Sequence, residues 1–192
     1  MNWETLLCLG DSITIGARSY LGYPEYCGNF LKNETAKDWN VVNCAVSGYT
    51  TIDLVQHIDK NWSHLNETKP ELISLMIGTN DLKKNTSFSD FQIAFSLLLI
   101  KVKLLVKSRN IILNKIPSLR SGVMLPYNLS MNEMGIQYNN WISEIAKSHG
   151  LMLNEMPESD DLFFDGVHLN QKGSELWGKH LSQKILELRY ES

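Results

Sequence analysis

The chain has 192 residues, of which 43% are hydrophobic and 20% charged, and its net charge is -3. These values are typical of a globular protein with a substantial core, so we expect residues 1–192 to form a single domain. The slight acidic excess argues against nucleic acid or an anionic membrane as a partner, because both bind basic surfaces.

The three cysteines, Cys8, Cys27 and Cys44, match no zinc-binding spacing, so we expect no metal and no cofactor. The N-terminal residues show no signal-peptide pattern, which leads us to expect a cytoplasmic protein. The most apolar stretch, residues 95–106, contains Lys101 and Lys103 and is too short and too charged to span a membrane. Nothing in the sequence indicates an oligomeric state.

Short apolar runs typical of strands alternate with longer stretches of helical periodicity. In chain order we expect a strand at Thr5–Leu9, a helix at Pro24–Ala36, a strand at Val41–Cys44, a helix at Thr51–Ile58, a strand at Leu72–Ile77, a helix at Ser89–Lys107, a strand at Asn110–Ile116, a helix at Ser130–His149, a strand at Leu151–Asn154 and a helix at Asn170–Tyr190. This alternation predicts an α/β fold with a parallel sheet between two layers of helices.

Ligands of such sheets bind beyond the carboxyl ends of the strands, so we expect chemistry in the loops that follow the strands. The first loop, Gly10–Thr14, places Ser12 at a strand-to-helix turn, where its hydroxyl can meet a substrate carbonyl. Serine also caps helices, and that alternative stays open for Ser12.

The next two loops carry candidate hydrogen-bond donors for an oxyanion. Gly48, after the second strand, can bring its N–H close to a ligand because it has no side chain. The amide of Asn80, after the third strand, can donate to a developing negative charge. Either residue alone also fits an ordinary turn.

The fourth loop contains Asp165 and His168, three residues apart and just before the last helix. The carboxylate can reach the ring Nδ1 and leave Nε2 to accept a proton from a serine. A surface histidine beside a carboxylate is the alternative. All four loops fall at one predicted sheet edge and together supply a nucleophile, a base, an orienting carboxylate and oxyanion donors, the set that acyl transfer requires.

These motifs together resemble the four sequence blocks of the SGNH hydrolases, also called GDSL-type esterases and lipases: Gly10-Asp11-Ser12-Ile13, Gly48, Gly78-Thr79-Asn80-Asp81 and Asp165-Gly166-Val167-His168. The first block has isoleucine where the family name has leucine. The resemblance implies a three-layer α/β/α fold, similar to flavodoxin, with five parallel strands.

The resemblance also implies roles for individual residues. Ser12 would be the nucleophile and, through its own N–H, one oxyanion donor. Gly48 and Asn80 would supply the second and third donors. His168 would be the general base and acid, and Asp165 its partner.

The expected substrate is a small-molecule ester, such as an acetylated sugar or a lipid ester, and we expect a short acyl group such as acetyl. Tyr49, Leu82 and Val167 flank motif residues and are candidates for substrate contacts. The loop from Pro117 to Leu129 includes Tyr127 and could form an apolar wall over the site, or its apolar residues could pack the loop down.

Several alternatives share this pattern. A lysophospholipase, a thioesterase or an acyltransferase would use the same triad. A flavin-binding module or a non-catalytic domain on a flavodoxin-like scaffold would leave His168 without a role.

Overall fold

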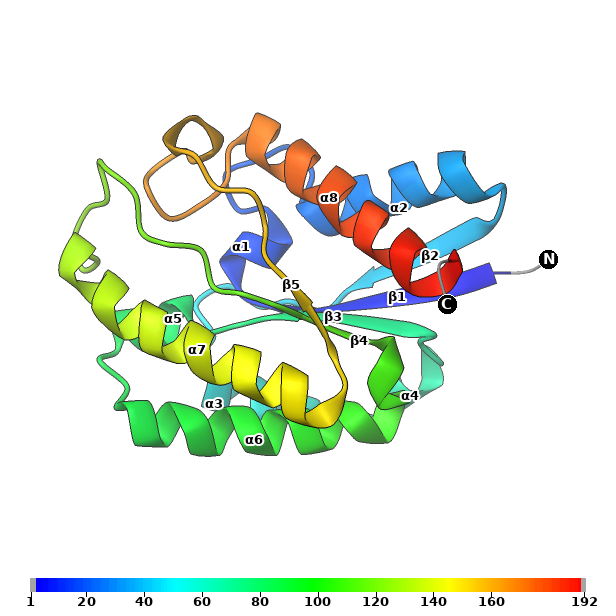
Figure 1. The fold of residues 1–192 in the computed structure, drawn as a ribbon, viewed down its shortest axis with the longest axis horizontal. Helices are drawn as coiled ribbons and strands as arrows, with labels where there is room; N and C mark the ends of the chain where they lie inside the picture. The colour runs from blue at the N-terminus through cyan, green and yellow to red at the C-terminus, as the bar shows by residue number, and fades with distance from the viewer. Residues whose placement is uncertain (1–2, 191–192) are drawn as a thin grey trace.

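Five parallel strands form one central sheet in the order β2-β1-β3-β4-β5, with helices on both faces (Figure 1). The structure, a computed structural model, describes residues 3–190. Met1, Asn2, Glu191 and Ser192, which the single-domain prediction includes, lie outside the described residues. The strands are β1 (Trp3–Gly10), β2 (Asp38–Asn43), β3 (Leu72–Met76), β4 (Ile111–Asn114) and β5 (Met152–Asn154).

Two layers of helices cover the sheet. The helices are α1 (Ser12–Ile15), α2 (Tyr23–Thr35), α3 (Thr51–Lys60), α4 (Trp62–Glu67), α5 (Thr79–Lys83), α6 (Phe88–Leu105), α7 (Asn132–His149) and α8 (Gln171–Tyr190). In Figure 1, α2 and α8 lie above the sheet, and α3, α6 and α7 lie below it. Among the described residues, none of the helices combines the length and the apolarity that crossing a bilayer requires.

The predicted α/β/α architecture and the flavodoxin-like strand order are confirmed. All five predicted strands and all five predicted helices form, with ends that differ by a few residues. The sequence analysis missed α1, α4 and α5, which have only four to six residues. Helices this short show less than two turns of apolar periodicity, so no pattern distinguishes them from loops.

Local signals explain several helix ends. Thr50 caps α3 and forms a capping box with Asp53. Gly150 ends α7 in the left-handed conformation, with φ of 61°. The Oδ1 atom of Asn170 accepts the N–H of Gly173 at 2.9 Å and so caps α8. The cap of α6 is Ser87, so this helix begins slightly earlier than predicted.

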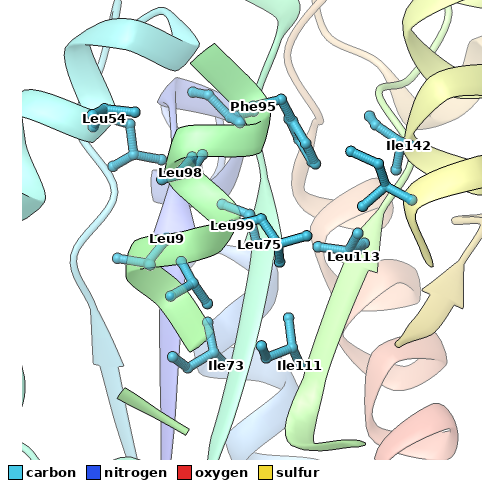
Figure 2. Close-up of a cluster of buried hydrophobic side chains, with 14 of the residues drawn as sticks. Leu9, Leu54, Ile73, Leu75, Phe95, Leu98, Leu99, Ile111, Leu113 and Ile142 are labelled. Atoms are coloured by element: carbon cyan, nitrogen blue, oxygen red, sulfur yellow. The ribbon is translucent and has the colours of Figure 1, made fainter. Parts of the chain in front are cut away.

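Two hydrophobic clusters hold the three layers together. Figure 2 shows the one below the sheet, where Phe95, Leu98 and Leu99 of α6 point toward apolar side chains of the strands. The cluster on the other face is built around Tyr23 of α2 and Trp177 of α8, both fully buried. The central strands β1, β3 and β4 are therefore covered on both faces, which explains their largely apolar sequences, whereas the edge strand β2 stays partly exposed along its length.

The close packing of α2 against α8 depends on Gly178. A Cβ atom built on Gly178 would lie 2.4 Å from Cβ of Tyr26 and 2.8 Å from the carbonyl oxygen of Tyr23. Gly135 of α7 differs, because a Cβ there would meet only Cδ1 of Leu82, at 3.6 Å. Of these two helical glycines, only Gly178 is required by its neighbours.

We expect Gly178→Ala to lower the free energy of unfolding by about 1–3 kcal/mol, since α2 must move to admit the methyl group. Gly135→Ala should raise it by about 0.5–1 kcal/mol, because alanine favours a helix and meets only ordinary contact distances. Urea unfolding of the two variants measures both changes. Equal effects of the two substitutions would contradict this account of the α2–α8 contact.

Candidate active site

Hydrogen bonds tie together the loops that leave β1, β2 and β3. The N–H of Val46 donates to the carbonyl of Gly10 at 3.0 Å, which joins the first and second loops. The Asn80 amide donates to the carbonyl of Tyr49 at 3.1 Å, which joins the second and third. These strands are neighbours in the sheet, so the loops meet at its carboxyl edge.

Ser12, His168 and Asp165 form a continuous chain of contacts at this edge. Oγ of Ser12 lies 2.9 Å from Nε2 of His168, and Nδ1 of His168 lies 2.9 Å from Oδ2 of Asp165. A serine bonded to an imidazole that is held by a carboxylate on its other side is the arrangement that activates a hydroxyl for nucleophilic attack. Asp11, not Ser12, caps α1, so the serine hydroxyl is not used as a helix cap.

Asp165 is held by the same turn that carries His168. Its Oδ1 atom accepts the backbone N–H groups of Val167 at 3.1 Å and His168 at 2.8 Å. Burial raises the pKa of Asp165, but the hydrogen bonds and charge of His168 outweigh this and leave the pKa below its ordinary value. Asp165 therefore stays ionised and can orient the imidazole. Arg18 brings a positive charge to the same carboxylate, with Nε 3.6 Å from Oδ2 of Asp165.

Two backbone N–H groups are free to act as oxyanion donors. Ser12 is the first residue of α1, where an N–H has no acceptor within the helix. Gly48 has a φ of 82°, and a Cβ built on it would meet nothing within 4 Å. Within residues 3–190, the N–H of Gly48 donates to no protein acceptor. The space beside the Gly48 backbone is thus unoccupied by other protein atoms, which leaves room for a ligand at this N–H.

The side chain of Asn80 is oriented by two partners. Its Nδ2 donates to the carbonyl of Tyr49, and its Oδ1 accepts the hydroxyl of Tyr127 at 3.1 Å. A flipped amide would place its oxygen against the Tyr49 carbonyl, so the pair of bonds fixes which end is the nitrogen. One Nδ2 hydrogen remains for another acceptor. Burial and the charges of Asp11 and Asp165 raise the pKa of Tyr127, which keeps its hydroxyl protonated and able to donate.

A cavity of about 170 Å³ lies against the imidazole. It is lined by Met124, Leu125, Pro126, Tyr127, Asp165, Val167 and His168. Of the four predicted substrate-contact residues, the structure places Tyr127 and Val167 in this lining. Leu82 is 3% exposed and packs in the cluster below the sheet, and Tyr49 packs against the edge of that cluster. Substrate contacts at all four residues remain predictions.

Two buried carboxyl groups were not singled out by the sequence analysis. Burial, together with the nearby charge of Asp81, raises the pKa of Asp11 to about 7, although the hydrogen bond from the N–H of Ile13 opposes this. Burial likewise raises the pKa of Asp81 to about 6. Oδ2 of Asp81 accepts the N–H of Thr51 at 2.8 Å and its hydroxyl at 3.0 Å, which anchors the start of α3. Both aspartates belong to the motif blocks that carry Ser12 and Asn80, and that membership was the signal available in the sequence.

No group of three or more His, Cys, Asp or Glu side chains within residues 3–190 could hold a metal ion.

The sequence matches the GDSL-like Lipase/Acylhydrolase family over residues 8–176. No curated protein sequence matches the chain significantly. Three of the solved structures that share its fold illustrate the similarity. The lipase/acylhydrolase from Enterococcus faecalis is 21% identical with a TM-score of 0.78, and the match covers 95% of each chain. An acetylxylan esterase from Geobacillus stearothermophilus is 23% identical with a TM-score of 0.72, covering 96% of this chain and 93% of that one. A psychrotrophic esterase from Pseudoalteromonas sp. is 18% identical with a TM-score of 0.72, covering 96% and 97%.

The buried carboxyl of Asp11 predicts a pH dependence of stability. Its pKa of about 7 exceeds the value of about 3.9 in an unfolded chain, so between these pH values only the folded chain keeps the proton. The unfolding free energy contributed by this group therefore falls as the pH rises from about 4 to about 7. An asparagine side chain cannot titrate, so Asp11→Asn should gain stability relative to wild type across this window.

Thermal melting at a series of pH values measures this difference. Glu34→Gln, at an exposed position, controls for the removal of one negative charge. If the difference in melting temperature between Asp11→Asn and wild type stays constant from pH 4 to pH 7, this result would contradict the raised pKa of Asp11.

Proposed function

Because the chain belongs to the GDSL-like lipase/acylhydrolase family and is a carboxylic ester hydrolase, we propose that it cleaves short-acyl esters through a Ser12-His168-Asp165 triad. One observation carries the proposal: Ser12 Oγ, both ring nitrogens of His168 and the Asp165 carboxylate form an unbroken chain with links of 2.9 Å. Membership of a hydrolase family favours an enzyme over a flavin-binding module.

In the proposed first half-reaction, Ser12 Oγ attacks the ester carbonyl carbon while Nε2 of His168 takes the hydroxyl proton. The negative charge that develops on the carbonyl oxygen is stabilised by the N–H groups of Ser12 and Gly48 and by the Asn80 amide. The tetrahedral intermediate then breaks its bond to the alcohol oxygen, which leaves with the proton from His168.

Water completes the proposed cycle. His168, again neutral, takes a proton from a water molecule that attacks the acyl-serine, and the same donors hold the second oxyanion. Collapse of this intermediate releases the acid and returns the proton to Ser12. Asp165 stays ionised throughout and stabilises the imidazolium that forms twice in each cycle.

The cavity beside His168 suggests where the alcohol part of the ester binds. His168 must deliver its proton to the leaving oxygen, so the alcohol lies on the imidazole side of the scissile bond. The wall there is apolar, since Met124, Leu125 and Pro126 line the same cavity as His168. We propose that this wall binds the apolar face of the alcohol part, for instance the face of a sugar ring. The acetylxylan esterase with this fold supports acetyl as the acyl group.

Ser12→Ala should abolish hydrolysis of a small activated ester while the protein melts at the wild-type temperature. A fluorophosphonate probe should label wild type at Ser12 and leave Ser12→Ala unlabelled. If purified Ser12→Ala hydrolysed the ester at the wild-type rate, this result would contradict the triad proposal. Labelling of neither protein would indicate a non-catalytic domain.

A panel of esters tests the substrate class with the same two proteins. One series keeps the acetyl group and varies the alcohol, and the other keeps the alcohol and lengthens the acyl chain. We expect kcat/KM to fall as the acyl chain grows and to depend on the apolar area of the alcohol. A preference for long acyl chains would contradict the short-acyl proposal, and an added alcohol acceptor that collects the acyl group would identify a transferase.

Tyr127 should act as a positioning residue through Asn80. Asn80→Ala is expected to lower kcat on the order of 100-fold, the typical effect of losing one oxyanion donor. Tyr127→Phe removes the hydrogen bond that orients the amide and should lower kcat by roughly 5- to 10-fold with little change in KM. In the double variant, Tyr127→Phe should cause no further loss, because the amide it orients is gone.

Tyr138→Phe is the matched control. The Tyr138 hydroxyl is also buried and donates to a backbone carbonyl, that of Thr86, at 2.6 Å, but it does not contact Asn80. This variant should lose stability and keep its kcat. Additive losses in the Asn80→Ala, Tyr127→Phe double variant would refute the positioning role.

A further inference from the structure

The outward face of α6 carries a row of exposed apolar side chains. Ile93, Leu97, Ile100 and Leu104 are 62%, 42%, 59% and 69% exposed. Figure 2 shows that the opposite face of the same helix, with Phe95, Leu98 and Leu99, already packs on the sheet. Core packing therefore accounts for the inner face of α6 but not for these four residues, which we call the α6 seam.

The spacing of the seam is that of a helix–helix contact. Its residues are separated by four, three and four positions, the repeat that places apolar side chains along one line facing a second helix. The line extends about 16 Å, given a rise of about 1.5 Å per residue. Ile52 of α3, 43% exposed, lines one cavity together with Ile93 and so extends the apolar surface sideways. Large exposed apolar patches of this kind mark interaction sites.

We propose that the seam binds the α6 seam of a second copy of this chain, with the two helices antiparallel about a twofold axis. The axis would pass between Leu97 and Ile100. In this register Leu97 faces Ile100 of the second copy, and Ile93 faces Leu104 of the second copy. Every seam residue then meets an apolar residue, as a self-complementary interface requires.

Charges at the two ends of α6 favour this direction. Asp90 is exposed at the start of the helix, and Lys107 is exposed just beyond its end. The antiparallel arrangement brings the start of α6, with Asp90, toward the end of α6 of the second copy, beyond which Lys107 follows, once on each side of the axis. A parallel arrangement would instead bring Lys103 and Lys107 of both copies together, and like charges oppose such a contact.

A cavity supplies a matching shape at the end of the seam. It has a volume of about 230 Å³ and is lined by Ile52, Asp81, Thr86, Asp90, Ile93 and Ala94. The proposed register puts Leu104 of the second copy opposite Ile93, at the mouth of this cavity. One helix pair and its flanks bury less than the roughly 1,600 Å² of a standard interface, so the dimer should be reversible.

Sedimentation velocity over a range of protein concentrations tests the proposal. The average mass of wild type should rise with concentration toward twice the monomer mass. Ile100→Asp places a charge in the seam of both copies and should weaken association by more than about tenfold. Leu176→Asp, on α8 in the other helical layer and 39% exposed, is the matched control and should associate like wild type. Melting curves and ester hydrolysis check that each variant is folded.

Charge reversal tests the register. Lys107→Glu should weaken association a few-fold by placing like charges opposite Asp90. Combining it with Asp90→Lys should restore association. Melting curves of this pair check α6, because Asp90 also accepts the Ser87 hydroxyl at the helix cap.

Three outcomes would overturn the proposal. Wild type could remain monomeric at its highest soluble concentration, or Ile100→Asp and Leu176→Asp could weaken association equally. Phosphatidylcholine vesicles could retain wild type but not Ile100→Asp, which would assign the seam to a lipid surface. Failure of the paired charge reversal to restore association would overturn the antiparallel register.

Discussion

Parallel strands end at the same edge of a sheet, and every group of the candidate site depends on this constraint. Ser12, Gly48 and Asn80 lie in the segments that directly follow β1, β2 and β3, with Ser12 at the start of α1 and Asn80 in α5, and these strands are neighbours in the order β2-β1-β3. Residues separated by more than 30 positions in the chain are therefore brought together by strand pairing alone. The cores on both faces hold the strands in register and thereby hold the loops, so the burial of side chains such as Leu75 and Trp177 matters for chemistry at the edge.

The sequence was sufficient to predict the architecture and to predict that Ser12, His168 and Asp165 come together. Nearly continuous apolar runs identified most of the strands, because strands covered on both faces have no polar side to interrupt the pattern. The separation of three residues between Asp165 and His168 predicted their contact, because a turn of that length brings the two side chains together. The start of α6 was misplaced, since Ser87, Ser89 and Asp90 are all good caps and only the structure shows which one is used.

Other features could not be predicted because they depend on contacts between distant loops. The hydroxyl of Tyr127 meets Asn80 across 47 positions of sequence, and no local pattern indicates that distance. Leu82 stands next to a motif residue, but the helix that follows Asn80 turns its side chain into the core. The raised pKa values of Asp11 and Asp81 likewise follow from burial, which a one-dimensional pattern of polar residues does not reveal.

The short turn from Asp165 to His168 sets the geometry of proton transfer, a task distinct from the recognition of the substrate. The carboxylate bonds to the backbone of its own turn as well as to the imidazole, so the geometry of the base is set within four residues. The segment from Pro117 to Leu129, which supplies most of the apolar wall, meets this turn through its backbone, because the N–H of Arg120 donates to the carbonyl of Gly166 at 2.8 Å. The side chains of Met124 and Leu125 in the same wall are 72% and 88% exposed. Under the proposed function, exchanges of these two side chains can change which alcohols are accepted while the backbone contact keeps the proton-transfer groups in place. Such a division allows one scaffold to diversify its substrates while its chemistry stays constant.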